Sequence, residues 1–189
     1  MDYEIKRIGN FDNRVLMSLF LIKMIRLIFD CLRSPYDFAN IIQVALALNN
    51  CEIYITGDSL NHKHPKIFGK VASWSSNIKK HGFPDSLKIY YFDSLEFCVD
   101  KLREEGIQLI GTSPHAKKSF YDLDLSGDEK VLVFGTEVGG LSRRKMALMD
   151  EIIKVPMSGN IDFMTLSVAA PIVAYEISRQ QREFIRASK

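Results

Sequence analysis

The feature that most constrains the fold is a glycine-rich stretch between two apolar segments in the last third of the chain. Val131–Phe134 is a run of four apolar residues, as expected of a buried strand, and Ile152–Pro156 is a second, mostly apolar segment that includes Lys154. Between them, three glycines in six residues (135–140) surround one carboxylate, Glu137. Glycine lets a backbone turn tightly and approach a ligand closely. The stretch therefore predicts a strand, a ligand-binding loop, a short basic helix and a second strand.

Short apolar segments alternate with helical patterns along the rest of the chain. Further strands are predicted at Ile25–Phe29, Cys51–Thr56, Leu87–Phe92 and Ile107–Ile110. Helices are predicted from Asp37 to Asn49, around Pro65–Asn77, at Ser94–Glu105 and at Leu166–Arg186. Strands of this length between such helices indicate βαβ units. We predict an α/β domain over residues 25–189, with a mostly parallel sheet and helices on both faces, preceded by a helical extension over residues 1–24.

Bulk properties predict one soluble cytoplasmic domain. A chain of 189 residues suits a single core. The apolar run over residues 15–29 contains Lys23 and Arg26 and is too short to span a membrane. No metal is predicted, because His62 and His64 lack a third ligand in register and the cysteines are scattered. The net charge is +2, so binding to nucleic acid would need local basic clusters.

Three loops follow the carboxyl ends of predicted strands. They are residues 111–114, 135–141 and 156–160. In an open α/β sheet, ligands bind outside the carboxyl ends of the strands. We therefore expect these three loops to hold one ligand together.

The sequences GTEVGGLS, VPMSG and LSVAA, at this spacing, resemble motifs 2 and 3 of the SpoU/TrmH family of SPOUT methyltransferases. The resemblance covers roughly residues 25–176. It implies a C-terminal trefoil knot, a homodimer, and binding of S-adenosylmethionine for methylation of tRNA or rRNA, usually on a ribose 2′-hydroxyl. The cofactor contacts that it implies are Thr112, Gly135, Glu137, Gly140, Val155, Met157, Met164 and Leu166.

The side chains that the family directs at its substrate are largely changed. In motif 1 the family Asn corresponds to Asp37, and the Arg that serves the target ribose corresponds to Gln43. In motif 3 a Ser has become Phe163 and an Asn has become Thr165, whereas Ser167 matches. The catalytic candidates are Glu137, Asp37, Gln43, Thr165 and Ser167.

Two of these candidates have a structural and a functional interpretation. Glu137 either caps the helix that follows it or orients the substrate. Asp37 is either a helix N-cap or a general base. Both interpretations stay open on the sequence alone.

Basic residues near the predicted site suggest contacts with RNA phosphates. Arg143, Arg144 and Lys145 follow the glycine loop, and Arg33 precedes motif 1. A further pair, Lys79 and Lys80, lies elsewhere in the chain. Structured RNA is the expected partner. Trp74 and Phe68 are expected in the core.

Three functions remain to be weighed. The first is a methyltransferase, with ribose as the expected acceptor despite Gln43. The second is a catalytically inactive member of the fold that binds RNA or serves as a scaffold. The third, an unrelated nucleotide-binding enzyme, is disfavoured because the chain has neither a GxGxxG nor a Walker-type loop.

Overall fold

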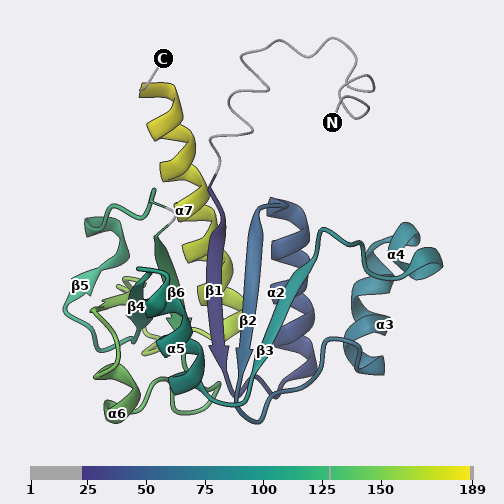
Figure 1. Cartoon of the computed structure of the whole chain (residues 1–189), viewed down its shortest axis with the longest axis horizontal. Helices are drawn as coiled ribbons and strands as arrows, with labels where there is room; N and C mark the ends of the chain where they lie inside the picture. Colours follow the sequence, from purple (N-terminus) through teal and green to yellow (C-terminus); the bar gives the residue numbers. More distant parts are fainter. Residues whose placement is uncertain (1–22, 128, 188–189) are drawn as a thin grey trace.

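The computed structural model describes residues 23–127 and 129–187. Seven parallel strands form one sheet in the order β3-β2-β1-β6-β4-β7-β5 (Figure 1). The strands are β1 (Ile25–Asp30), β2 (Cys51–Thr56), β3 (Lys88–Phe92), β4 (Gln108–Thr112), β5 (Lys118–Ser119), β6 (Lys130–Phe134) and β7 (Glu151–Lys154). Because every neighbouring pair is parallel, all carboxyl ends lie at one edge of the sheet, where β1 and β2 point downward in Figure 1.

Helices cover both faces of this sheet, as predicted. They are α2 (Pro35–Leu48), α3 (Pro65–Trp74), α4 (Ser76–His81), α5 (Leu95–Glu104), α6 (Arg143–Met146) and α7 (Leu166–Ala187), with a 3-10 turn at Phe120–Asp122. Strand β1 serves both faces, because its side chains alternate. Leu27 and Phe29 pack with the helices α2, α3 and α7, whereas Ile28 packs with α5 on the opposite face. The mostly parallel α/β architecture is thus confirmed.

The six predicted strands are confirmed to within two residues at each end, whereas the short strand β5 is not predicted. Two helices also differ from the predictions, one in its start and one in its continuity. Helix α2 is capped by Ser34 and not by Asp37, because the Ser34 hydroxyl accepts a hydrogen bond from the backbone N–H of Asp37 at 3.1 Å. The helix predicted around residues 65–77 breaks at Ser75, whose backbone is extended and whose hydroxyl caps α4. Trp74, just before this break, is 39% exposed and does not lie in the core, whereas Phe68 packs against the core.

Two predictions are left where they stood. The helical extension over residues 1–24 falls almost wholly outside the described residues. The C-terminal trefoil knot stays a prediction, because strand order and register give neighbours and not the path of the chain through a loop. In the part of the chain that the structure describes, no helix is long and apolar enough to cross a membrane.

Candidate cofactor pocket

A cavity of about 330 Å³ lies at the carboxyl edge of the sheet. It is lined by residues from the loops after β4, β6 and β7 and from the start of α7, as expected from their positions after strand ends. A pocket of this size, largely apolar with a few polar groups, is typical of small-molecule sites, which usually enclose about 300–1,000 Å³. The three loops predicted to share one ligand therefore do meet at one cavity.

The loop after β6 is shaped by its glycines. A Cβ atom on Gly135 would lie 2.0 Å from the carbonyl carbon of Gly140, so no larger residue fits there without movement of the backbone. Thr136 and Gly140 exchange two backbone hydrogen bonds, of 3.1 and 2.9 Å, and Gly140 has a φ of 61°. The Thr136 hydroxyl also accepts a hydrogen bond from the Gly139 N–H at 3.1 Å. The loop is thus folded back on itself and presents its backbone to the cavity.

The other two loops supply the walls. The Thr112 hydroxyl, at the end of β4, donates to the Val133 carbonyl at 3.1 Å, and the Ser113 N–H donates to the Ile153 carbonyl at 2.9 Å. The loop after β7 contributes mainly apolar side chains. Met164 and Leu166 line the cavity, whereas Thr165 between them does not.

All eight residues that the motifs marked as cofactor contacts line this one cavity. The sequence analysis did not select several neighbours that also line it. Two of them lie in the selected loops, two lie one or two residues beyond one, and two lie on helices α6 and α7, so the missing signal was position in the fold and not residue type. These neighbours include Ser113, His115, Leu141, Met146, Asp162 and Ala169.

The Glu137 carboxylate connects the glycine loop to motif 1. Its Oε1 accepts hydrogen bonds from the backbone N–H groups of Ser34 at 2.6 Å and Arg33 at 3.0 Å. It does not cap the helix that follows it, since Ser142 caps α6 by accepting from the Lys145 N–H at 3.3 Å. Glu137 instead holds the β1–α2 loop against the wall of the cavity.

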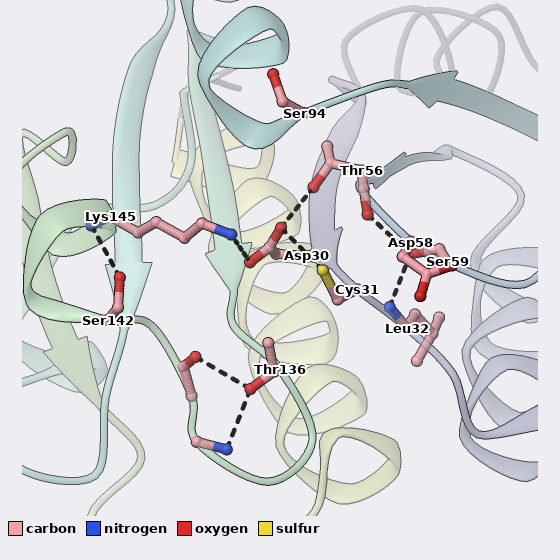
Figure 2. A network of polar contacts seen from close by, with 12 residues as sticks. Asp30, Cys31, Leu32, Thr56, Asp58, Ser59, Ser94, Thr136, Ser142 and Lys145 are labelled. Atoms are coloured by element: carbon pink, nitrogen blue, oxygen red, sulfur yellow. Dashed lines mark hydrogen bonds and ion pairs between the residues drawn. The ribbon is translucent and has the colours of Figure 1, made fainter.

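A second link in this region is an ion pair between helix α6, which follows the glycine loop, and the end of strand β1. The Lys145 ammonium contacts Oδ2 of Asp30 at 2.5 Å, and the Thr56 hydroxyl donates to Oδ1 at 3.1 Å (Figure 2). Asp30 is 1% exposed, so it needs these partners. Burial acts to lower the pKa of Lys145, but the hydrogen bond and the charge of Asp30 outweigh it and the pKa is raised. Lys145, which the sequence analysis predicts to bind RNA, thus pairs with a buried carboxylate.

The other catalytic candidates lie outside the cavity lining. Asp37 occupies the first turn of α2, and Gln43 is exposed six residues later on the same helix. Thr165 and Ser167 share a hydrogen bond of 3.1 Å between their hydroxyl groups at the start of α7. Among the five candidates, Glu137 therefore stands apart as a residue that lines the cavity.

The remaining RNA-binding candidates are at the surface. Arg143 and Arg144 are exposed on α6. Arg33 is also exposed, and its guanidinium pairs with Asp58 at 2.8 Å. Within the described ranges, no cluster of three or more His, Cys, Asp or Glu side chains is placed to hold a metal ion.

The residues present fit an adenosyl cofactor. The cavity offers backbone groups of the glycine loop and an apolar wall made by Val155, Met157, Met164 and Leu166. Apolar side chains can enclose a flat base, while exposed N–H and C=O groups can hydrogen-bond its polar edge. The absence of space for a Cβ at Gly135 shows that the loop already has the close fold that such a site needs.

Comparison with known proteins supports this assignment. The model of the SpoU rRNA methylase family matches residues 24–175. The 23S rRNA (guanosine-2'-O-)-methyltransferase RlmB of Xanthomonas axonopodis pv. citri is 28% identical over 157 residues, which is 82% of this chain and 58% of the relative. RlmB of Coxiella burnetii is 26% identical over 93% of this chain and 68% of its own length. The chain thus spans little more than half of the first relative.

Solved structures agree with the fold. The SpoU methyltransferase AviRb from Streptomyces viridochromogenes superposes with a TM-score of 0.71 at 26% identity, over 85% of this chain and 61% of AviRb. A structure of AviRb in complex with the cofactor AdoMet gives the same TM-score at 25% identity, over 85% of this chain and 62% of that one. Because the family model covers most of the chain, from β1 into α7, this protein belongs to the SpoU rRNA methylase family.

Proposed function

We propose that the chain is an S-adenosylmethionine-dependent methyltransferase that acts on structured RNA, either tRNA or rRNA, with a ribose 2′-hydroxyl as the acceptor. One observation carries the proposal: eight motif residues from three separate loops line one cavity of about 330 Å³. The names of the relatives point the same way, because RlmB is a guanosine-2'-O-methyltransferase and AviRb has been solved with AdoMet.

The chemistry asks the protein mainly for alignment. The cofactor, when bound, supplies an activated methyl group. The residues of this chain would hold it and exclude water, with Val155, Met157, Met164 and Leu166 against its apolar parts. The protein must then position the acceptor hydroxyl and accept one proton.

Glu137 positions motif 1 through two backbone N–H groups, so it orders the loop that leads to Asp37. Asp37 is the candidate base, since its carboxylate lies in the first turn of α2 and its backbone N–H, not its side chain, serves the Ser34 cap. Gln43 can donate a hydrogen bond to RNA but cannot supply the charge of an arginine. The proposed enzyme therefore relies on alignment more than on charge at the acceptor.

A homodimer is part of the proposal. Helix α7 exposes large apolar side chains that a monomer would leave in water: Val168 is 47% exposed and Tyr175, seven residues later, is 53% exposed. We propose that residues 25–189 form one domain that pairs through this helix. Sedimentation equilibrium should give twice the chain mass, and Tyr175→Glu should shift the protein toward monomer.

The first test is calorimetric titration with S-adenosylmethionine and with its demethylated product. Micromolar binding of either one is expected. Methyl transfer to unmodified tRNA and rRNA transcripts is then measured with tritiated cofactor. Absence of binding at millimolar cofactor would contradict the proposal, and binding without transfer to any transcript would favour an RNA-binding member that does not methylate.

Variants of Glu137 separate positioning from chemistry. Glu137→Gln keeps an oxygen that can accept from Ser34 and Arg33, so we expect most of the transfer rate to survive. Glu137→Ala removes the acceptor and should lower the rate at least tenfold, while cofactor affinity falls less. Equal loss in both variants would show that the negative charge itself is required.

A further inference from the structure

Residues 59–84, which make up most of the segment between β2 and β3, are the most basic stretch of the chain. Residues 59–84 contain five lysines and three histidines but no Asp or Glu. The whole chain carries a net charge of +2 and this segment carries +5, so the other 163 residues carry a net charge of −3. The positive charge of the protein is therefore local, and its place in the fold is set by α3 and α4.

Helix α3 separates an apolar face from a basic face. Ile67 and Val71 are buried against the core, whereas Lys66, Lys70 and Trp74 follow at intervals of four residues, the spacing of one helix face. Trp74 is 39% exposed. We call Lys63, Lys66, Lys70, Lys79 and Lys80, with Trp74 and Tyr36, the α3–α4 basic surface.

The lysines of this surface are not neutralised. In residues 23–127 and 129–187, none of the five forms an ion pair with a carboxylate. Several lysines elsewhere do: Lys88 pairs with Glu52, Lys101 with Glu104, and Lys145 with Asp30. A solvated helix face normally carries charges of both signs. Five ammonium groups without a carboxylate among them favour an anionic partner.

Aromatic rings lie among these charges. The Lys70 ammonium lies 5.2 Å from the ring centroid of Tyr36 on α2 and 5.3 Å from that of Trp74. Tyr36 is 61% exposed. Proteins that bind unpaired RNA combine this pair of features, with basic side chains on phosphates and aromatic rings on bases. Lysines beside Trp and Tyr rings also occur on proteins that bind membrane surfaces. The choice of RNA therefore rests on where this surface lies relative to the cofactor pocket.

The surface adjoins the cofactor pocket. Tyr36 is two residues after Ser34, whose N–H group is bound at 2.6 Å by Glu137 in the pocket wall. Helix α3 lies beside α2, on the outer side away from α7 (Figure 1). A strand of RNA with its acceptor nucleotide at the pocket would therefore continue past Tyr36 onto α3.

We propose that the α3–α4 basic surface binds the RNA segment next to the acceptor nucleotide. The lysines contact phosphates, and Trp74 and Tyr36 stack against unpaired bases. The inference rests on the proposed function for the identity of the acceptor, but the binding itself can be tested without methyl transfer.

The test is fluorescence anisotropy with a labelled RNA stem–loop that carries an unpaired loop, titrated from about 50 to 200 mM salt. Lys66→Ala/Lys70→Ala should weaken binding at least tenfold and lower the slope of log K against log salt by about 1.4 to 1.8. Trp74→Ala should weaken binding about tenfold without changing that slope, because stacking releases no counterions. Lys88→Ala/Lys101→Ala is the matched control, with the same change in charge, and should stay within about twofold.

The outcomes separate this proposal from the proposed function. Each variant is first checked for an unchanged thermal midpoint and for unchanged calorimetric binding of S-adenosylmethionine, since none of these residues lines the cavity. If the test variants bind the stem–loop like the control, the RNA surface is wrong while the cofactor pocket stands. If they lose affinity for phosphatidylserine vesicles but not for RNA, a membrane partner replaces the RNA. If RNA binding falls as expected but no protein binds the cofactor, the proposed function fails and the RNA surface stands.

Discussion

The cofactor pocket and the first turns of α2 lie at the same edge of the sheet but depend on different chemical groups. The pocket uses glycines, backbone N–H and C=O groups and apolar side chains, and its eight motif residues converge on one cavity. The first turns of α2 instead carry the functional groups of Asp37 and Gln43, which lie outside that cavity. A binding site made from backbone groups keeps its ligand contacts when side chains change, whereas a site that depends on one side chain loses its function when that side chain is replaced. Residues that position the acceptor can therefore change in this fold without loss of cofactor binding.

The largest expected effect comes from adding a methyl group to the pocket loop. Gly135→Ala places a Cβ atom 2.0 Å from the Gly140 carbonyl carbon and 2.1 Å from the Leu141 nitrogen, and backbone atoms cannot turn aside as a flexible side chain can. We expect a loss of about 4 kcal/mol in unfolding free energy, above the usual cost of overpacking, and a loss of cofactor affinity of about a hundredfold. Urea unfolding and calorimetry measure the two effects.

The matched control is Gly69→Ala in α3, where an added Cβ atom meets nothing within 4 Å. It should raise stability by about 0.5–1 kcal/mol, because alanine is the better helix former. If both substitutions destabilise the protein equally, the comparison between a crowded loop and an open helix is wrong.

The next effect concerns the ion pair that ties α6 to β1. Lys145→Met leaves the Asp30 carboxylate buried with Thr56 as its main partner, so we expect a loss of about 2 kcal/mol, reduced from the cost of a fully buried pair because Lys145 reaches solvent. Lys101→Met, which removes an exposed partner of Glu104, should change stability little.

The pH dependence of this loss has a defined sign. The pKa of Lys145 is raised above its ordinary value of 10.5 in the folded protein. The stability that it contributes is therefore complete below 10.5 and is lost as the pH rises through the folded-state pKa. The gap in thermal midpoint between wild type and Lys145→Met should stay constant from about pH 7 to 9 and narrow above about pH 10.5. A gap that narrows near neutral pH would show that another group controls it.

The smallest expected effect concerns Gln43 in the first turns of α2. Gln43→Arg supplies the side chain that the resemblance in motif 1 implies at the target ribose, so we expect the methylation rate on a responsive RNA to rise about tenfold, equivalent to about 1.4 kcal/mol. Gln108→Arg adds the same charge at the amino end of β4, on the opposite edge, and should leave the rate unchanged. If Gln43→Arg has no effect on the rate, Gln43 does not reach the acceptor, and the comparison between the pocket and the first turns of α2 does not hold.

Much of this arrangement could be predicted from sequence, because its determinants are local. Runs such as Val131–Phe134 mark buried strands, and the order of the loops after them fixes which residues meet at the sheet edge. The Asp30–Lys145 pair could not be predicted, since the two residues are far apart in sequence and neither is in an unusual local context. The sequence does not decide between Asp37 and Ser34 as the cap of α2, because both residue types are good caps and the choice depends on where Pro35 starts the helix.

Surface features were harder still to predict. Trp74 was expected in the core because large aromatic residues usually are buried. Its exposure follows from the break at Ser75, which ends α3 before the next turn could cover the ring. The gathering of Lys70 and Tyr36 next to it depends on the packing of α3 against α2, which no local pattern contains.

The position of β1 has a consequence for how the chain reaches this structure. In the β1 register, Arg26 lies opposite Glu52 of β2 on one side and Val131 of β6 on the other. This inner strand therefore gains its two neighbours at widely separated times during synthesis. The unit formed by β1, α2, β2 and β3 can assemble first, with one long edge of β1 left unpaired until β6 emerges. Folding should therefore be slow and should depend on chain length. The ribosome-bound chain is most exposed to misassociation between the completion of β3 and the arrival of the glycine loop.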